Sequence, residues 1–262
     1  MRSFNISATG AGAQAAAIDN ISNNIANANT TSFKKGFFTT TDLHYQTERR
    51  AGGAVEAGSD IIVPTSLQYG TGSAPSAIIR DLSQGAAINT NRPLDMSLDG
   101  IGYFVLNMPD GSQSFTRDGT FTVDPNTGQL VTALGYIVSP GINIPNDYKK
   151  ILVRNDGTVS VEVPGNDAPQ ELGQIDIAMF VNPNGLELIG DNILLQTDAS
   201  GEAQFGNAGQ DNYGTVRSGW LEGSNVNPII EMTDLVKYQR VYEMNVKVIT
   251  ISDQMLERVV NV

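Results

Sequence analysis

The side chains that most often carry out chemistry are scarce in this sequence of 262 residues. It contains no cysteine, which excludes disulfides, thiol catalysis and zinc sites built from thiolates. The one histidine, His44, has Asp42 and Glu48 close by, but no second histidine or cysteine with which to share a metal ion. His44 is therefore predicted to be an ordinary surface or packed residue.

Acidic and glycine-rich turns are the next candidates. Residues 124–128 lack the alternating acids and the final glutamate of a calcium loop, so they and residues 198–202 are predicted to be plain turns. Gly100 and Gly102 precede a β-prone run, without the third glycine and the helix of a dinucleotide-binding motif. We expect no catalytic residue, no cofactor and no metal ion. A carboxylate pair in a cleft stays open as an alternative, because the sequence singles none out.

Charge excludes two classes of partner. The formal net charge of −12 argues against nucleic acid, whose phosphates require a basic surface, and against an anionic membrane surface. Apolar runs such as Ile61–Val63 are too short to span a bilayer, although this run could form one strand. The N-terminus also lacks the apolar region of a cleaved signal peptide.

The first 35 residues are predicted to contain a helix with few charges. Its apolar positions repeat every seven residues at Phe4, Ala11, Ile18 and Ile25, with Ala8, Ala15 and Ile21 between them. The segment from Asn20 to Asn29 is rich in asparagine, a mediocre helix former, so packing must hold it. Two interpretations stay open: a surface helix with a thin core stripe, or a helix that is stable only against copies of itself.

A second long helix is predicted over residues 226–262. Asn227 and Pro228 have the types preferred at the N-cap and the first helical position, and no glycine or proline follows. Apolar residues again recur every seven positions, at Leu235, Tyr242, Ile249 and Leu256. A helix at each end with this repeat predicts that the two ends pair as a coiled coil.

The middle of the chain is β-like. From 95 to 204, short β-prone runs alternate with turns such as Asp110-Gly111 and Asp156-Gly157, a pattern typical of an antiparallel sandwich or barrel. Residues 36–94 are predicted to be an extended linker with some β pairing, and residues 205–225 a return connector. The predicted fold class is α+β, with paired terminal helices around a central antiparallel β domain.

Both ends carry motifs that resemble one protein family, and the resemblance extends over nearly the whole chain. The N-terminal motifs are Asn23-Asn24-Ile25-Ala26-Asn27 and Thr30-Thr31-Ser32-Phe33-Lys34; the central one is Phe115-Thr116-Arg117-Asp118-Gly119; the C-terminal one is Leu221-Glu222-Gly223-Ser224-Asn225-Val226. They are similar to the signatures of the bacterial flagellar rod and hook family. Residues 42–53 and 69–72 are most similar to its distal-rod members. The family usually has glycine where this chain has Ser32, which predicts that the helix exit differs or that Asn29 takes the left-handed conformation.

This resemblance implies a structural subunit of a hollow helical homopolymer, the distal rod, which crosses the periplasm and transmits torque from motor to hook. The implied partners are further copies of the chain, proximal rod proteins, the hook protein, the peptidoglycan-layer and outer-membrane ring proteins, and the flagellar type III export apparatus, which would export it without a cleaved signal peptide. A hook or proximal-rod subunit is the nearest alternative. A secreted β-rich adhesin is an alternative outside the family.

Eight residues are predicted to lie at the interfaces between subunits: Ile21, Asn24, Ile25, Asn27, Leu235, Tyr242, Ile249 and Leu256. The opposing expectation is that half of them pack only within one subunit. Residues 46–70 are glycine-rich but β-capable, and we expect them to form an additional contact that keeps the rod straight.

Overall fold

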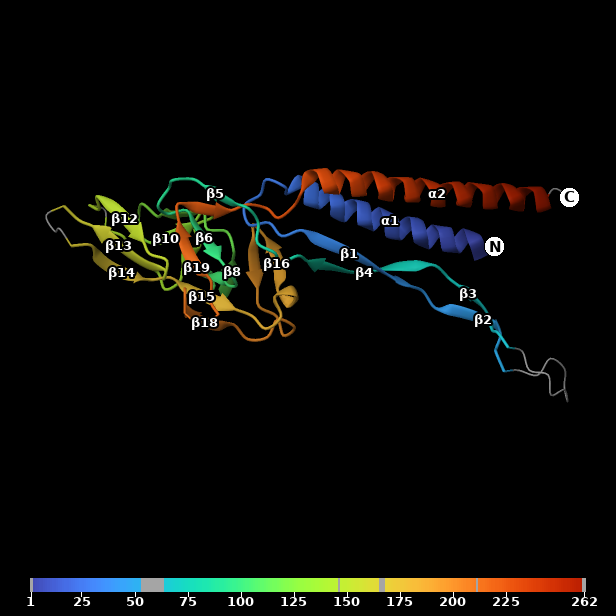
Figure 1. The fold of residues 1–262 in the computed structure, drawn as a ribbon, viewed down its shortest axis with the longest axis horizontal. Coiled ribbons are helices and arrows are strands. Elements are labelled where there is room, and N and C mark those ends of the chain that lie inside the picture. Colours follow the sequence, from blue (N-terminus) through green and yellow to red (C-terminus); the bar gives the residue numbers. More distant parts are fainter. Residues whose placement is uncertain (1, 53–63, 146, 165–167, 211, 261–262) are drawn as a thin grey trace. The chain divides into compact units, whose positions relative to one another are not determined.

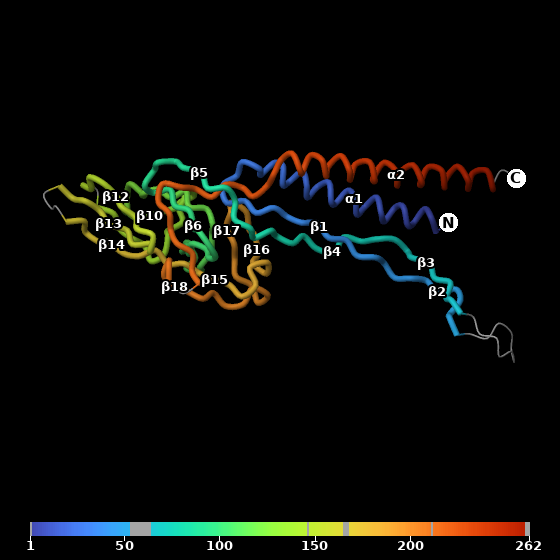
Figure 2. Tube along the Cα trace, viewed as in Figure 1, coloured from blue at the N-terminus to red at the C-terminus, as the bar shows by residue number. Residues whose placement is uncertain are grey.

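The computed structural model describes residues 2–52, 64–145, 147–164, 168–210 and 212–260. The chain divides into two units (Figures 1 and 2). Residues 1–26, 36–81 and 227–262 form the helical unit, and residues 27–35 and 82–226 form the β unit. The β unit therefore extends beyond the predicted range of 95–204. The strand predicted at Ile61–Val63 lies outside the described residues.

Two antiparallel helices dominate the helical unit, α1 (Arg2–Ala26) and α2 (Pro228–Val260), drawn side by side in Figure 1. The Ser3 hydroxyl lies 3.3 Å from that of Ser252, which places the start of α1 beside the end of α2. Asn227 caps α2 as predicted, because its side-chain oxygen accepts a hydrogen bond of 3.1 Å from the Ile229 amide. In the described part of the chain, no helix has both the length and the apolar character needed to cross a membrane.

The buried stripe of α1 differs from the predicted one. Phe4 and Ala8 are exposed, whereas Ser7, Ala11, Ala13, Ala17, Ile21 and Asn24 are buried. Small side chains occupy most of the buried positions because the two helices approach closely. At Gly10, an added Cβ would lie 3.3 Å from the Asn245 side chain. Of the predicted stripe only Ala11 and Ile21 are buried, and coiled-coil pairing of the two helices stays a prediction.

A two-stranded β ribbon completes the helical unit. Strands β1 (Gly36–Asp42) and β4 (Ser73–Arg80) pair antiparallel, with a bulge between Thr39 and Thr40. Strands β2 (Tyr45–Arg49) and β3 (Leu67–Gly70) form a second antiparallel pair. Much of the segment predicted as a linker thus forms regular paired strands.

The β unit is antiparallel, as predicted. Its elements are β5 (Ala87–Asn89), β6 (Met96–Asp99), β7 (Tyr103–Asn107), β8 (Gln113–Thr116), β9 (Phe121–Val123), β10 (Leu130–Thr132), β11 (Ile137–Val138), β12 (Lys150–Val153), β13 (Thr158–Glu162), β14 (Gln170–Gln174), β15 (Asp176–Met179), a 3-10 turn (Pro183–Gly185), β16 (Glu187–Gly190), β17 (Ile193–Leu195), β18 (Gln204–Asn207), β19 (Thr215–Ser218) and β20 (Trp220–Glu222). The largest sheet has the order β16-β17-β8-β7-β11-β10-β9, with β15 joining β7 to β18. A three-stranded sheet, β12-β13-β14, and the pairs β19-β6 and β20-β5 complete the unit. The predicted return connector thus contributes most of β18 and all of β19 and β20.

The β unit has its own apolar core. Phe104 and Phe121 pack edge to face with ring centres 5.2 Å apart, among buried aliphatic side chains of several strands. On a second cluster, Phe115 packs edge to face against Phe180 at 4.7 Å. This core is large enough to hold the β unit together, and it fixes the positions of the loops described below.

The predicted turns form. Asp110-Gly111 joins β7 to β8, with Gly111 at a φ of +84°. In the turn at 124–128, the Asp124 carboxylate accepts hydrogen bonds from the Asn126 amide (3.0 Å) and the Thr127 hydroxyl (2.7 Å), which lower the pKa of Asp124. Its oxygens are used inside the turn.

Candidate functional site

The predicted interface residues near the N-terminus lie in three different environments. Ile21 and Asn24 are buried inside the helical unit. Ile25, close to the end of the same helix, is half-buried. Asn27 belongs to the β unit, where its side-chain oxygen accepts a hydrogen bond of 3.1 Å from the Thr30 hydroxyl. A contact of these residues with a second subunit stays a prediction.

On α2, the predicted residues also divide. Leu235 and Ile249 are half-buried, whereas Tyr242 and Leu256 are each 39% exposed. The last two therefore keep apolar surface that the chain itself does not cover. Leu235 and Ile249 expose only part of their side chains.

Asn24 lies in a buried polar junction inside the helical unit. Its Nδ2 donates to the Gly36 carbonyl and to the Glu231 carboxylate, both at 3.1 Å, and its Oδ1 accepts from the Gly36 amide at 3.0 Å. Asn20 adds a hydrogen bond of 2.7 Å to the same carbonyl. One amide thus joins α1 to the first residue of β1 and to α2. The asparagine-rich segment is held by these bonds, which offset the poor helix propensity of asparagine.

Along its whole length α2 exposes large apolar side chains, interspersed with exposed charged ones such as Arg240 and Lys247. The large exposed apolar side chains are Ile229, Ile230, Met232, Val236, Tyr242, Met244, Val246, Val248, Ile251, Met255, Leu256 and Val259. Part of this surface is an open groove lined by Ile229, Met232, Val236 and Met244, with Lys237 and Arg240 beside them. An apolar groove together with so many exposed apolar side chains is typical of an interaction site.

The end of the β ribbon lies beside the start of α1. Arg2 forms an ion pair with Glu48 at 2.5 Å, and its guanidinium lies 4.6 Å from the centre of the Tyr69 ring. Of the predicted contact segment 46–70, residues 53–63 lie outside the described residues. The described strands of this segment expose Leu67 and Tyr69.

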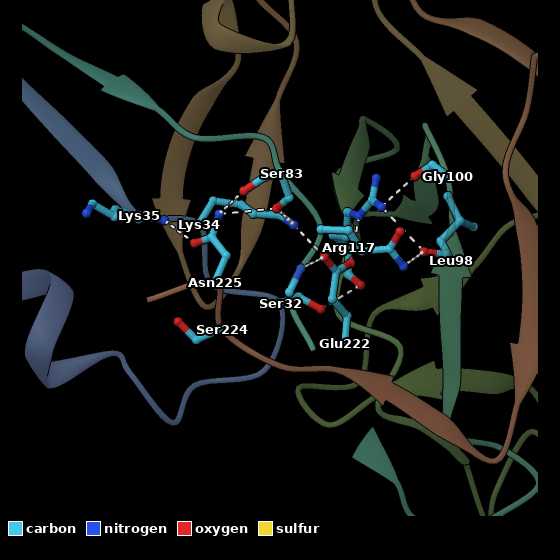
Figure 3. A network of polar contacts seen from close by, with 12 residues as sticks. Ser32, Lys34, Lys35, Ser83, Leu98, Gly100, Arg117, Glu222, Ser224 and Asn225 are labelled. Atoms are coloured by element: carbon cyan, nitrogen blue, oxygen red, sulfur yellow. Dashed lines mark hydrogen bonds and ion pairs between the residues drawn. The ribbon is translucent and has the colours of Figure 1, made fainter. Parts of the chain in front are cut away.

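A buried charge centre occupies the β unit (Figure 3). The Glu222 side chain is 1% exposed and forms ion pairs with Lys34 and with Arg117, whose Nε lies 2.8 Å from Oε2. The Gly85 amide donates to Oε1 at 3.0 Å. Burial raises the pKa of Glu222, but the charges of Arg117 and Lys34 and their hydrogen bonds outweigh burial, so the pKa is below its ordinary value. Glu222 is therefore a buried carboxylate with its oxygens satisfied.

Both cations also bind backbone carbonyls. Arg117 donates to the carbonyls of Gly100 (2.6 Å) and Gly102 (2.9 Å), and Lys34 donates to the carbonyl of Ser83 (2.8 Å). These bonds satisfy the donors that Glu222 does not use. They also attach the centre to the loop between β6 and β7.

Segment 30–35 is attached to the same region by its backbone. Ser32 donates its amide to the Glu222 carbonyl and its hydroxyl to the Arg117 carbonyl, both at 2.8 Å. The Asn225 side-chain oxygen accepts from the Lys35 amide at 2.8 Å. Ser32 itself has a φ of +56°, in the left-handed region. The alternative that Asn29 takes this conformation is wrong, because Ser32 itself takes it, and the two hydrogen bonds of Ser32 offset the cost of a side chain there. A difference of this exit from that of the family stays a prediction.

Sequence reasoning missed this centre. Lys34, Arg117 and Glu222 each lie in a motif quoted for the resemblance, but these motifs are far apart in the chain. Among the described residues, no group of three or more His, Cys, Asp or Glu side chains could hold a metal ion. The chemistry of the centre is therefore structural, since every charged group in it is neutralised by a neighbour or bonded to backbone.

Comparison with known proteins places each of these segments in a family. The family model "Flagella basal body rod protein" matches residues 4–34, "Flagellar hook protein FlgE/F/G D1 domain" matches 97–161, and "Flagellar basal body rod FlgEFG protein C-terminal" matches 217–262. The flagellar basal-body rod protein FlgG of Caulobacter vibrioides is 42% identical over 98% of this chain and 97% of its own. The chain belongs to the flagellar basal-body rod family. FlgG of Agrobacterium fabrum is 44% identical over 97% of both chains, and the flagellar hook-basal body complex protein FlhP of Bacillus subtilis is 31% identical over 91% of both.

This rod-family chain is a structural subunit of the flagellum, and its family is not enzymatic. The carboxylate-pair enzyme and the secreted adhesin are thereby excluded. The three matched segments each contribute one charged group of the buried centre: Lys34, Arg117 and Glu222.

Proposed function

We propose that this rod-family chain is a subunit of the distal rod, and that copies of it assemble into a hollow helical drive shaft. The shaft carries torque from the motor to the hook and passes exported subunits through its centre. The observation that carries the proposal is the set of large exposed apolar side chains on α2, from Ile229 to Val259 and here called the apolar stripe, which no other part of the described chain covers. A second copy of the chain would cover it.

Assembly through the terminal helices has a physical reason. One helix pair leaves its outer seam in water, so packing against neighbouring copies supplies the burial that it lacks. In the assembled rod, the terminal helices pack as a coiled coil, with Tyr242 and Leu256 on the surface between subunits. Contacts that do not close on themselves produce a helical filament.

A subunit in the distal rod would also contact other flagellar proteins. The proximal rod proteins lie below it, the hook protein above it, and the peptidoglycan-layer and outer-membrane ring proteins around it. The flagellar type III export apparatus delivers the subunit across the periplasm without a cleaved signal peptide. The FlgG relatives, which are similar over nearly their full length, favour this place over the hook or the proximal rod.

Electron cryotomography of cells that lack this gene tests the assignment. A shortened rod without a hook is expected. A complete rod without a hook would move the subunit to the hook, and normal motors on swimming cells would refute a flagellar role.

The apolar stripe is tested separately by a matched pair of substitutions on α2. Met244→Glu places a charge in the exposed groove, whereas Gln239→Glu adds the same charge at an exposed polar position. Met244→Glu should abolish rod completion while the purified subunit stays folded. Equal motility of the two strains would contradict the role of the stripe.

Residues 46–70 are proposed to form the additional contact that keeps the rod straight. The exposed Leu67 and Tyr69 on β3 support this, because they offer apolar surface near the end of the ribbon. A strain with residues 46–70 deleted should build curved or unstable rods. An unchanged straight rod would refute this part of the proposal.

A further inference from the structure

Three connecting segments of the β unit meet at one buried carboxylate. Segment 27–35 lies in sequence between α1 and β1, segment 82–86 follows β4, and segment 221–226 precedes α2. Every covalent path between the helical unit and the β unit runs through one of these segments. The first contributes Lys34, the second the Gly85 amide, and the third Glu222 itself.

We propose that Glu222 is a positioning residue that clasps these three segments to the β unit through Arg117. The clasp holds the points where the chain enters and leaves the β unit as one assembly. This inference rests on the proposed function for its biological role: in a torque-carrying subunit, force that arrives along one segment is shared with the other two.

Other contacts also hold these segments. Strand β20 pairs with β5, Leu221 and Val226 are buried, and the Gly223 amide donates to the Ala86 carbonyl at 2.8 Å. An added Cβ at Gly85 would lie 1.9 Å from the Gly223 carbonyl oxygen, so two backbones run in direct contact. The Asn225 side chain adds bonds of 3.2 Å to Ser83. Glu222 adds to these contacts a buried charge that binds the other two segments through Lys34 and the Gly85 amide.

A buried ion cluster also couples its members. Removing one partner leaves an uncompensated buried charge, so the loss spreads to the remaining contacts. Lys34 bonds directly to the Ser83 carbonyl of segment 82–86, and it shares Oε1 of Glu222 with the Gly85 amide. Disturbing segment 27–35 should thus loosen segment 82–86. Apolar packing alone would not predict this transfer.

Hydrogen exchange of the full-length chain tests the clasp. Glu222→Gln keeps the shape of the side chain but removes its charge, and Lys34→Met leaves the Arg117 pair in place. Glu171→Gln is the matched control, because Glu171 forms a solvent-exposed pair of 3.0 Å with Arg154 in the same unit.

In Glu222→Gln, the Gly85 amide, which donates to the carboxylate, should exchange at least about tenfold faster, as expected for a weakened hydrogen bond to a group that has lost its charge. The Ser32 amide, which donates to the Glu222 main-chain carbonyl, should also exchange faster, because its segment is loosened. The amides of β13 in the core should be unchanged, as should all amides in Glu171→Gln. In Lys34→Met, the Gly85 amide should accelerate as well. Acceleration confined to the substituted segment, or equal throughout the β unit, would overturn the clasp.

Cells in which each variant replaces the natural subunit test the biological role. Lys34→Met and Glu222→Gln should reduce swimming and shorten rods, while Glu171→Gln should swim normally. Normal swimming of the first two strains, with accelerated exchange, would overturn the torque role. Failure of the proposed function itself would be distinguished by normal flagella in cells without the gene, an outcome that leaves the exchange result on the purified chain unaffected.

Discussion

Replacing Asn24 with alanine removes three hydrogen bonds from the buried junction of the helical unit. Two join Asn24 to the amide and carbonyl of Gly36, and one joins it to the Glu231 carboxylate. Each neutral bond contributes about 1 kcal/mol and the charged one about 1.5–3 kcal/mol. Alanine regains about 0.6 kcal/mol through its higher helix propensity. The free energy of unfolding of the helical unit should therefore fall by about 3–4 kcal/mol.

Urea unfolding with two probes measures this loss. Far-ultraviolet circular dichroism reports the helical unit, because α1 and α2 both belong to it. Fluorescence reports the β unit, because Trp220 is the one tryptophan of the chain. With a slope of about 2 kcal/mol per molar urea, the midpoint followed by circular dichroism should fall by roughly 1.5–2 M. The urea midpoint followed by Trp220 fluorescence should not change.

Asn5→Ala is the control, since it makes the same substitution at an exposed position of the same helix. It should leave the stability unchanged or raise it slightly. If Asn24→Ala behaved like Asn5→Ala, the junction would contribute nothing to stability. If it shifted both probes equally, its effect would not belong to the helical unit, and the reasoning would be refuted in either case.

Three further predictions concern other parts of the chain. Because folding lowers the pKa of Glu222, the stabilisation that its carboxylate provides should be complete above about pH 4.5, the ordinary pKa, and be lost as the pH falls through the folded pKa. Glu222→Gln should therefore weaken the fall in stability of the β unit at acid pH, measured by Trp220 fluorescence. An unchanged dependence of stability on pH would contradict this. Ser32→Gly should change the stability of the β unit by less than about 0.5 kcal/mol, because glycine relieves the left-handed backbone and so offsets the lost hydroxyl hydrogen bond. Ser32→Val should lower this stability by about 2 kcal/mol or more. Equal stabilities of the two variants in urea unfolding would show that the backbone is not strained. Gly72→Ala places a Cβ 1.9 Å from the Thr9 hydroxyl at a φ of +123°, so it should lower the stability of the helical unit by about 2–3 kcal/mol in urea unfolding. Gly52→Ala should lower it by about 1 kcal/mol, because its Cβ meets no described atom within 4 Å. Similar losses in the two variants would show that the Thr9 side chain moves aside easily.

Local features of the fold were predictable from the sequence. The N-cap at Asn227 and the turns at Asp110-Gly111 and 124–128 depend on a few neighbouring residues, so local chemistry is sufficient to predict them. The scarcity of histidine and the absence of cysteine excluded most catalytic and metal chemistry before any fold was known.

The choice of buried face was not predictable in the same way. The seven-residue repeat of α1 indicated one apolar stripe, but Phe4 is exposed and Ser7 is buried. The face that a helix buries depends on the shape of what packs against it, and α2 approaches closely enough to favour small side chains. The partners of Asn24 could not be predicted either, because Gly36 and Glu231 belong to other elements that only folding brings to α1.

A long helix at each end, antiparallel strands between the helices, and the motifs of the rod and hook family could all be predicted from the residues alone. These properties follow from periodicity, turn chemistry and residue type, which act over a few positions. Only the tertiary structure decided that Lys34, Arg117 and Glu222 meet, although 188 positions separate Lys34 from Glu222. A buried carboxylate is stable only where its cations are brought to it, and folding of the whole β unit is what brings them there.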